Sequence, residues 1–274
     1  MQTIVITGAS DGIGAAAARR LAGGDVRLIL VGRSPTKTRA VAAETGAEYH
    51  VSDFARLAHV RELAAAITSS TDRIDVLANN AGGMFAGPVP TEDGHEKTFQ
   101  VNHLAPYLLT HLLLDGLLAA GGRVVNTSSI AARLYPRLDL DDLNGWRNYT
   151  DTRAYGNAKL ANILFTAGLH EKFHGEGLSA VAFHPGMVAT NFASHTDGYL
   201  HRVYHGALSR FLTSPTQGGE RLVHFLEGRP GREWESGNYY ARPGRIGRAH
   251  PVAYRPGTVQ EHWRRSADML GVRW

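Results

Sequence analysis

A glycine-rich turn lies between the first strand pattern and the first helix pattern of this chain. Residues 2–7 form a short β-branched run, residues 12–22 are rich in alanine, and Gly8, Gly12 and Gly14 lie at the turn between them. Glycines at such a turn let the backbone approach a diphosphate, and the helix N-terminus offers free N–H groups and a positive dipole end. A glycine turn can also serve tight packing alone. The strand before it and the helix after it favour the nucleotide-binding interpretation.

The rest of the chain alternates the same two patterns. Apolar, strand-like runs cover residues 26–31, 47–51, 74–78, 123–127, 179–183 and 238–241. Helix-like segments cover residues 35–45, 57–69, 92–118, 153–174, 216–227 and 259–270, with a break expected near Pro106. Near-continuous apolar strands separated by helices are typical of a parallel sheet covered on both faces. With right-handed crossovers, this predicts an α/β fold, a single-domain Rossmann-type doubly wound parallel sheet of about seven strands with helices on both faces.

Composition is compatible with one globular domain spanning residues 1–274. The net charge of +4 comes with scattered arginines, which argues against nucleic-acid binding. The longest apolar stretch, residues 104–118, is too short and too polar for a membrane span. The absence of cysteine excludes a disulfide framework, a thiolate metal site and a cysteine nucleophile. Because no signal peptide precedes the first strand, we expect a cytoplasmic protein.

Tyr155 and Lys159 are four residues apart in a helix-like segment, so their side chains point the same way. An ammonium near a phenol favours the phenolate, and such a tyrosine can pass a proton to or from a substrate oxygen. On most helices this spacing means only a solvated face. The pair therefore gains its meaning from the other motifs in the chain.

Four motifs, in this order along the chain, resemble the short-chain dehydrogenase/reductase family in its single-domain branch. They are Gly8-xxx-Gly12-x-Gly14, Asn79-Asn80-Ala81-Gly82, Ser129 and Tyr155-xxx-Lys159. The segment 128–165 looks like the retinol dehydrogenases and their relatives, which share the insertion at 138–143 and the run from Lys159 to Asn162. The resemblance covers nearly the whole chain.

This resemblance implies four catalytic residues. Tyr155 would be the acid/base, and Lys159 would lower the pKa of Tyr155 and hydrogen-bond the nicotinamide ribose. Ser129 would donate to the substrate oxygen, and Asn102 would hold a water of the proton relay. A buried amide that satisfies the backbone is the alternative for Asn102. For the neighbouring Ser128 we favour a structural hydrogen bond at the strand end.

The cofactor is expected along the carboxyl edge of the sheet, where the crevice of such a fold opens. Asp53 is expected near the adenine, although a helix cap competes with this role. Asn79 and Gly82 are expected over the adenosine, and the segment from Pro185 to Thr190 at the nicotinamide. The expected cofactor-binding residues are Gly8, Ser10, Asp11, Gly12, Ile13, Gly14, Arg33, Asp53, Asn79, Ala81, Gly82, Tyr155, Lys159, Pro185, Gly186, Val188 and Thr190.

The end of the second strand indicates which nicotinamide cofactor is bound. An NAD site usually has an acidic residue there for the ribose hydroxyls, and this chain has Arg33 instead. A guanidinium suits the 2′-phosphate of NADP(H), which a carboxylate would repel. Asp11 in the glycine turn works against the phosphate. We therefore expect NADP(H), with NAD(H) as the alternative.

Residues 189–213 are expected to form a substrate lid, and residues 242–274 a C-terminal tail with a helix. Aromatic and aliphatic side chains in the lid suit a hydrophobic alcohol or carbonyl compound, although they could equally be packing. His201 and His205 have helical spacing for a shared metal, but no acidic residue or cysteine lies beside them. We therefore expect no metal site.

The predicted function is an NADP(H)-dependent oxidoreductase that interconverts an alcohol with a ketone or aldehyde. An NAD-dependent relative is the alternative within enzymes, and a catalytically idle nicotinamide-nucleotide sensor or scaffold is the alternative outside them. The intact set of Asn102, Ser129, Tyr155 and Lys159 argues against the idle protein. Homo-oligomers are common in the family, and the oligomeric state of this protein is left open.

Overall fold

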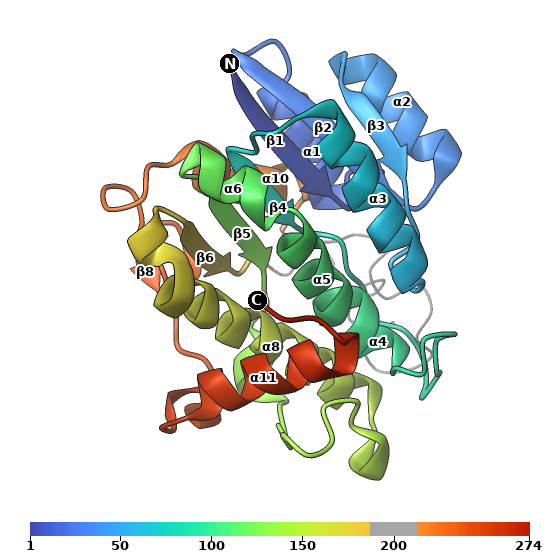
Figure 1. Ribbon diagram of the computed structural model, residues 1–274, viewed down its shortest axis with the longest axis vertical. Coiled ribbons are helices and arrows are strands. Elements are labelled where there is room, and N and C mark those ends of the chain that lie inside the picture. Colours follow the sequence, from blue (N-terminus) through green and yellow to red (C-terminus); the bar gives the residue numbers. More distant parts are fainter. Residues whose placement is uncertain (187–212) are drawn as a thin grey trace.

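Strands and helices alternate along the part of the chain that the computed structural model describes, residues 1–186 and 213–274 (Figure 1). The strands are β1 (Gln2–Thr7), β2 (Val26–Gly32), β3 (Glu48–Val51), β4 (Val76–Asn79), β5 (Arg123–Thr127), β6 (Ser179–Phe183), β7 (Tyr239–Arg242) and β8 (Arg245–Ile246). The α-helices are α1 (Gly12–Leu21), α2 (Pro35–Thr45), α3 (Leu57–Ser70), α4 (Lys97–Phe99), α5 (Ala105–Leu112), α6 (Leu114–Ala120), α7 (Ala131–Leu134), α8 (Asp151–Phe173), α10 (Pro215–Glu227) and α11 (Thr258–Leu270). Shorter helical turns are η1 (Gln100–Leu104), η2 (Trp146–Asn148), η3 (His174–Glu176) and η6 (Pro251–Tyr254).

The described strands form one eight-stranded sheet in the order β3-β2-β1-β4-β5-β6-β7-β8, parallel except for its last pair. The sequence predicts about seven strands. The additional one, β8, is two residues long and lies in the Pro/Gly/Arg-rich tail, where no apolar period can mark it. The strand order reverses between β1 and β4, and a doubly wound sheet opens its crevice at the carboxyl ends of such strands.

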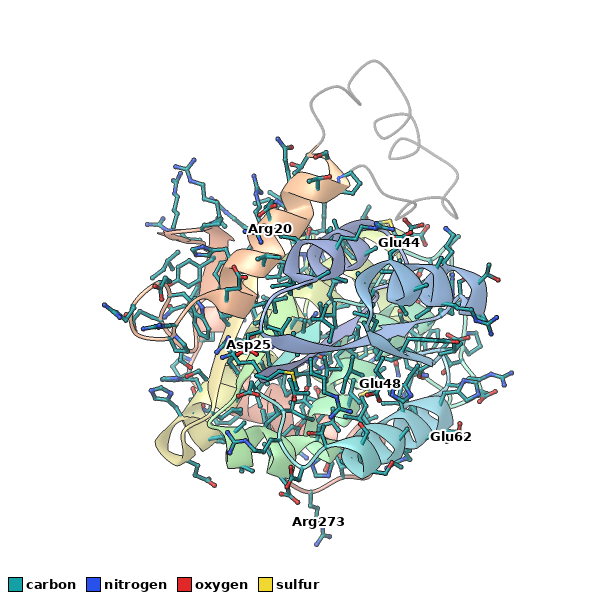
Figure 2. All side chains as sticks on the ribbon, turned by 90° about the horizontal axis from the view of Figure 1, so that it is seen from above. Arg20, Asp25, Glu44, Glu48, Glu62 and Arg273 are labelled. Atoms are coloured by element: carbon teal, nitrogen blue, oxygen red, sulfur yellow. The ribbon has the colours of Figure 1, made fainter. Side chains whose placement is uncertain are left out.

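Alternating side chains of the strands enter two cores, one on each face of the sheet. On β1, Val5 belongs to one core and Ile4 and Ile6 to the other, all of them fully buried. The first core includes residues of α3, α5, α8 and α11, and the second includes residues of α1, α2 and α10. In Figure 2, Arg20 of α1 and Glu62 of α3 accordingly lie on opposite sides of the strands. Each fully buried Ile or Leu contributes about 1.5–3 kcal/mol, so these cores fix the strand ends where the predicted site lies.

The C-terminal tail carries the expected helix, and that helix packs against α8. Trp263 of α11 lies against Gly168 of α8, so closely that a side chain at position 168 would meet the indole ring. The hydroxyl of Tyr107 in α5 donates to the Trp263 carbonyl oxygen at 3.0 Å. The three helices α5, α8 and α11 therefore form one packed group in front of the sheet in the view of Figure 1.

The helical segment between residues 92 and 120 differs from the expectation. In the π-turn η1 the N–H of Ala105 donates to the Gln100 carbonyl oxygen, and the chain continues helically through Pro106. The break comes later, at Leu113 between α5 and α6, so the break expected near Pro106 is wrong. Because proline has no N–H, the α-helical partner of the Asn102 carbonyl is missing. The proline marks irregular helical hydrogen bonding rather than a break.

By length and hydropathy, no single helix of the described segments could cross a membrane. The helical segments Lys97–Leu112 and Leu114–Ala120 are bent at 63° to each other, and they reach the length and hydropathy of a membrane span only when they are counted together.

Candidate active site

The glycine-rich turn packs β1 against the loop that follows β4. Gly8 has a φ of 68°, and a Cβ built on it would lie 2.8 Å from the Ala81 Cα, so other residues do not fit there. Gly12 and Gly14 lie in the first turn of α1, together with Ile13. The first N–H groups of a helix have no partners within the helix. This cradle at the carboxyl edge of the sheet fits the diphosphate of a nicotinamide dinucleotide.

Charged side chains surround the end of β2, where the adenosine is expected. Arg33 is exposed, and its side chain has no hydrogen bond or ion pair with the other described residues. Asp11 caps α1, with Oδ1 accepting from the Gly12 N–H at 2.8 Å. Its Oδ2 pairs with Nζ of Lys37, in the first turn of α2, at 2.7 Å. The ion pair offsets the negative charge that would otherwise act against a phosphate.

Tyr155 and Lys159 lie on α8 with only 7% and 3% of their surfaces exposed. Nζ of Lys159 is 5.5 Å from the centre of the Tyr155 ring and donates to the Thr127 carbonyl oxygen at 3.1 Å. Burial lowers the pKa of Lys159 to about 7. The helix therefore places the phenol and the ammonium together, and the charge on Lys159 depends on pH close to neutrality.

Ser128 and Ser129 follow β5 and have different surroundings. Ser128 is buried, and its hydroxyl donates to the carbonyl oxygen of Lys159 at 2.8 Å. This is the kind of structural hydrogen bond expected of Ser128. Ser129 is half-buried, and its Oγ accepts from the Ala131 N–H at 3.2 Å. Since Ala131 packs with Tyr155 in a small apolar cluster, Ser129 lies on the Tyr155 side of the strand end.

Asn102 lies in η1 and is fully buried. Its Nδ2 donates to the carbonyl oxygens of Gly83 at 2.7 Å and Thr98 at 2.8 Å, and its Oδ1 accepts from the Gly83 N–H at 3.1 Å. A Cβ built on Gly82 would collide with this Oδ1 and lie 3.2 Å from Nζ of Lys159. The Asn102 side chain is therefore a buried amide that holds the loop after β4 against Lys159, and its relay role stays a prediction.

The side chains of two predicted cofactor residues make hydrogen bonds within the protein. Nδ2 of Asn79 donates to Thr110 Oγ1 and Asn126 Oδ1, both at 3.0 Å, so this side chain turns into the protein. Only the backbone of Asn79 could make the predicted contact. Asp53 accepts from the Ala55 N–H at 3.1 Å, which forms a turn rather than a helix cap. The N–H of Leu57, which begins α3, binds Asp93 instead, so Asp53 is not the cap.

Pro185 and Gly186 follow β6 at the end where the nicotinamide is expected. Pro185 is buried, and Gly186 has a φ of 101° and lies beside Thr213 and Arg221. At the opposite end, Ser10 lies against Gly32. The remaining predictions lie outside the described residues: Val188, Thr190, the lid up to residue 212, His201 and His205.

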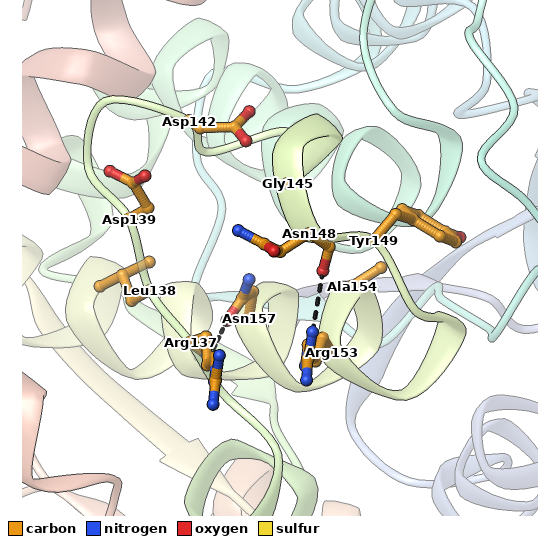
Figure 3. A pocket seen from close by; sticks show the side chains of 10 residues that line it. All are labelled: Arg137, Leu138, Asp139, Asp142, Gly145, Asn148, Tyr149, Arg153, Ala154 and Asn157. Atoms are coloured by element: carbon orange, nitrogen blue, oxygen red, sulfur yellow. Dashed lines mark hydrogen bonds between the residues drawn. The ribbon is translucent and has the colours of Figure 1, made fainter.

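A pocket of about 230 Å³ lies on the other side of α8 (Figure 3). Arg153 and Asn157 line it, and because they are i, i+4 on the helix, Tyr155 between them points to the opposite face. The rest of its lining comes from Ala154 and from the segment 137–149 before α8: Arg137, Leu138, Asp139, Asp142, Gly145, Asn148 and Tyr149. Asp139 and Asp142 accept N–H groups of the same segment. The pocket is thus separate from the predicted site.

Two residues outside the predicted set contact its members. Lys37 pairs with Asp11, and its position four residues after Arg33, at a helix start, is the signal that could have found it. Nδ2 of Asn162 donates to the carbonyl oxygens of Asn102 and Thr127. Asn162 lies three residues after Lys159 on α8, and residues three apart share a helix face.

Comparisons with known proteins agree with this arrangement. Residues 2–198 match the family model described as short chain dehydrogenase. The chain is 38% identical over 277 residues to "Putative daunorubicin C-13 ketoreductase DnrU" of Streptomyces sp. (strain C5), covering 98% of this chain and 93% of that protein. It is 34% identical over 281 residues to retinol dehydrogenase 12 of Mus musculus, covering 100% of this chain and 87% of that protein.

A solved structure extends the likeness to three dimensions. The structure of a metagenomic short-chain oxidoreductase in complex with NADP matches with a TM-score of 0.65 and 25% identity, over 88% of this chain and 96% of that one. The family match covers more than half of the chain, and the sheet order and the motifs agree with it. The chain therefore belongs to the short-chain dehydrogenases, NAD(P)-dependent oxidoreductases that act on CH–OH or C=O groups.

Proposed function

We propose that this chain is an NADP(H)-dependent oxidoreductase that interconverts a hydrophobic ketone or aldehyde with its alcohol. The observation that carries the proposal is the meeting of Ser129, Tyr155 and Lys159 where β5 ends beside α8. Lys159 is buried there with its ammonium 5.5 Å from the Tyr155 ring. A buried lysine so close to a tyrosine is a costly arrangement, and such arrangements cluster at functional sites.

The chain's own residues would handle the proton and the substrate oxygen. The bound nicotinamide would supply or accept the hydride. Tyr155 would give its phenolic proton to the carbonyl oxygen during reduction and take it back during oxidation. Ser129 would donate a hydrogen bond to the same oxygen and stabilise the charge that develops there. Lys159, when protonated, would favour the phenolate and hold the nicotinamide ribose.

The preference for NADP(H) rests on charge at the end of β2. Arg33 is exposed, directly follows the strand and keeps its guanidinium unpaired among the described residues. Asp11, the nearby carboxylate of the glycine turn, is paired with Lys37. A charge-assisted hydrogen bond to the 2′-phosphate contributes about 1.5–3 kcal/mol, or roughly tenfold or more in affinity. The NADP complex of the similar metagenomic oxidoreductase supports the same choice.

The substrate is proposed to be hydrophobic because exposed apolar side chains closely follow Ser129 along the chain. Leu134 and Tyr135, at the end of α7, are 60% and 43% exposed. They follow Ser129 by five and six residues, so they lie at the same end of β5. The names of the relatives, a retinol dehydrogenase and a daunorubicin C-13 ketoreductase, support an alcohol or ketone substrate.

A screen of ketones, aldehydes and alcohols with NADP(H) and NAD(H), read at the absorbance of the reduced cofactor, tests the proposal. We expect turnover of at least one hydrophobic carbonyl compound with NADPH, and turnover roughly a hundredfold or more lower in a Tyr155→Phe control. Tight NADPH binding without turnover across the screen would favour the idle sensor. Equal turnover with NADH would favour the NAD-dependent alternative.

A further inference from the structure

A chain of hydrogen bonds between buried side chains runs from the catalytic lysine to the C-terminal helix. Nδ2 of Asn162 donates to the carbonyl oxygens of Asn102 at 3.1 Å and Thr127 at 3.2 Å. Oδ1 of Asn162 lies 3.2 Å from Nδ1 of His103, and Nε2 of His103 lies 3.0 Å from Oγ of Ser266 in α11. Asn162 is 2% exposed, and His103 and Ser266 are fully buried.

The direction of these hydrogen bonds follows from the donors and acceptors. The amide nitrogen of Asn162 serves two carbonyls, so its oxygen faces His103 and can only accept. His103 must then carry its hydrogen on Nδ1, which leaves Nε2 to accept from the Ser266 hydroxyl. Burial lowers the pKa of His103 to about 3, so the ring stays neutral and the direction is stable around neutral pH.

Asn162 and Lys159 bind the same oxygen. Nζ of Lys159 donates to the Thr127 carbonyl at 3.1 Å and Asn162 donates to it at 3.2 Å, which uses both lone pairs. With this oxygen saturated, the ammonium has one fixed anchor, and its other hydrogens are left for the crevice. Loss of Asn162 would free a lone pair of Thr127 and let the ammonium shift along it.

The second carbonyl that Asn162 binds belongs to Asn102. In a regular α-helix this oxygen would accept from the residue four positions later, but that residue is Pro106, which has no N–H. Asn162 supplies the missing donor. The amide thus ties η1, the end of β5 and α8 together at the one point where Asn102 and Lys159 come close.

We propose that Asn162 and His103 are positioning residues, which hold Lys159 and Asn102 in place for the reaction, with Ser266 of α11 as the distant anchor. The inference rests on the proposed function for the roles of Lys159 and Tyr155. A displacement of about 1 Å in such a site costs up to about a hundredfold in rate. A side chain that only filled the core would instead affect the free energy of unfolding.

Two substitutions of His103 separate these roles. The amide of asparagine reaches the position of Nδ1, and the amide of glutamine reaches the position of Nε2. His103→Asn therefore keeps the donor to Asn162, whereas His103→Gln keeps only the contact with Ser266. We expect His103→Gln to lower kcat about tenfold or more with little change in KM, and His103→Asn to stay within about threefold of the unmodified enzyme.

A matched control is His224→Gln, in α10, which makes the same change in a histidine outside this network. We expect it to leave kcat unchanged. Equal kcat for His103→Asn and His103→Gln, measured per folded molecule, would overturn the proposal.

If His103→Gln does not fold, Asn162→Asp serves in its place, because it keeps the acceptor for His103 and removes both hydrogen bonds that the Asn162 amide donates. A near-normal kcat for Asn162→Asp would equally overturn the proposal.

A readout without substrate distinguishes this proposal from the proposed function. The dissociation constant for NADPH, measured by titration without substrate, reports on Lys159, which would hold the nicotinamide ribose. We expect His103→Gln to weaken NADPH binding several-fold and His103→Asn to leave it nearly unchanged. No NADPH binding by the unmodified protein would count against the proposed function. NADPH binding that stays as tight in His103→Gln as in the unmodified protein would refute the positioning role alone.

Discussion

The two ends of the predicted cofactor crevice differ in how exposed their charged and polar side chains are. At the adenosine end, Arg33 is exposed, and the side chains of the Asp11–Lys37 pair are each 55% exposed. At the nicotinamide end, Lys159 and Asn162 are 3% and 2% exposed and bind one shared carbonyl oxygen. Water and salt screen charges at the first end, whereas each polar group at the second end needs a protein partner. Substitutions should therefore change cofactor affinity at the exposed end, and rate and stability at the buried end.

The largest effect should come from the phenol at the buried end. Tyr155→Phe removes the proposed acid and little volume, so we expect turnover to fall roughly a hundredfold or more. Cofactor affinity should change little, as measured by titration of NADPH. Turnover close to that of the unmodified enzyme, on a substrate found in the screen, would rule out Tyr155 as the acid.

A second effect at the buried end concerns stability and pH. Burial lowers the pKa of Lys159 to about 7 from the ordinary 10.5, so the unfolded chain binds more protons between these values. The free energy of unfolding should therefore rise with pH in this window, by up to about 1.4 kcal/mol per pH unit from this group. Lys159→Met removes the contribution. Urea unfolding of both proteins at about pH 7.5 and about pH 8.5 measures it, and parallel pH dependence would show that Lys159 does not titrate in this window.

At the exposed end, Arg33→Ala should act on one cofactor only. We expect the unmodified protein to favour NADPH over NADH by at least about tenfold, and the variant to lose most of that preference. The NADH affinity should stay nearly constant, because NADH has no 2′-phosphate. Dissociation constants for both cofactors measure this. An unmodified protein that binds both equally well would remove the basis for NADP(H).

The smallest effect should come from Lys37→Ala. The ion pair with Asp11 is exposed, so its loss should weaken NADPH binding only about twofold to fivefold. The weakening should diminish at high salt, which screens exposed charges. Adding Asp11→Asn to Lys37→Ala should restore most of the NADPH affinity. If the double variant binds NADPH as weakly as Lys37→Ala, Lys37 acts on the cofactor other than by neutralising Asp11.

The contrast between the exposed and the buried end also explains how much of the fold and of the site could be predicted from the sequence. The exposed end depends on local features, since Arg33 follows a strand pattern directly and the glycine turn joins a strand to a helix. The sheet was predictable for the same reason, except for β8, which is too short to carry a period. The buried end was predictable only in part. Tyr155 and Lys159 share a helix face, but His103 and Ser266 are 163 residues apart, and the packing of both η1 and α11 against α8 brings them together.

The inward turn of Asn79 has a similar origin. Its partners Thr110 and Asn126 lie 31 and 47 residues away, so the motif alone does not indicate which way the amide points. Side-chain contacts between distant elements depend on packing, which periodicity does not encode.

The π-turn at Gln100–Leu104 also has an evolutionary consequence. Loss of one codon in this segment could turn it into a regular α-helix. Each helical residue rotates the chain by about 100°, so the deletion would rotate the residues on one side of it away from their partners. Asn102 would lose its contact with Gly83, or His103 would lose its contact with Asn162.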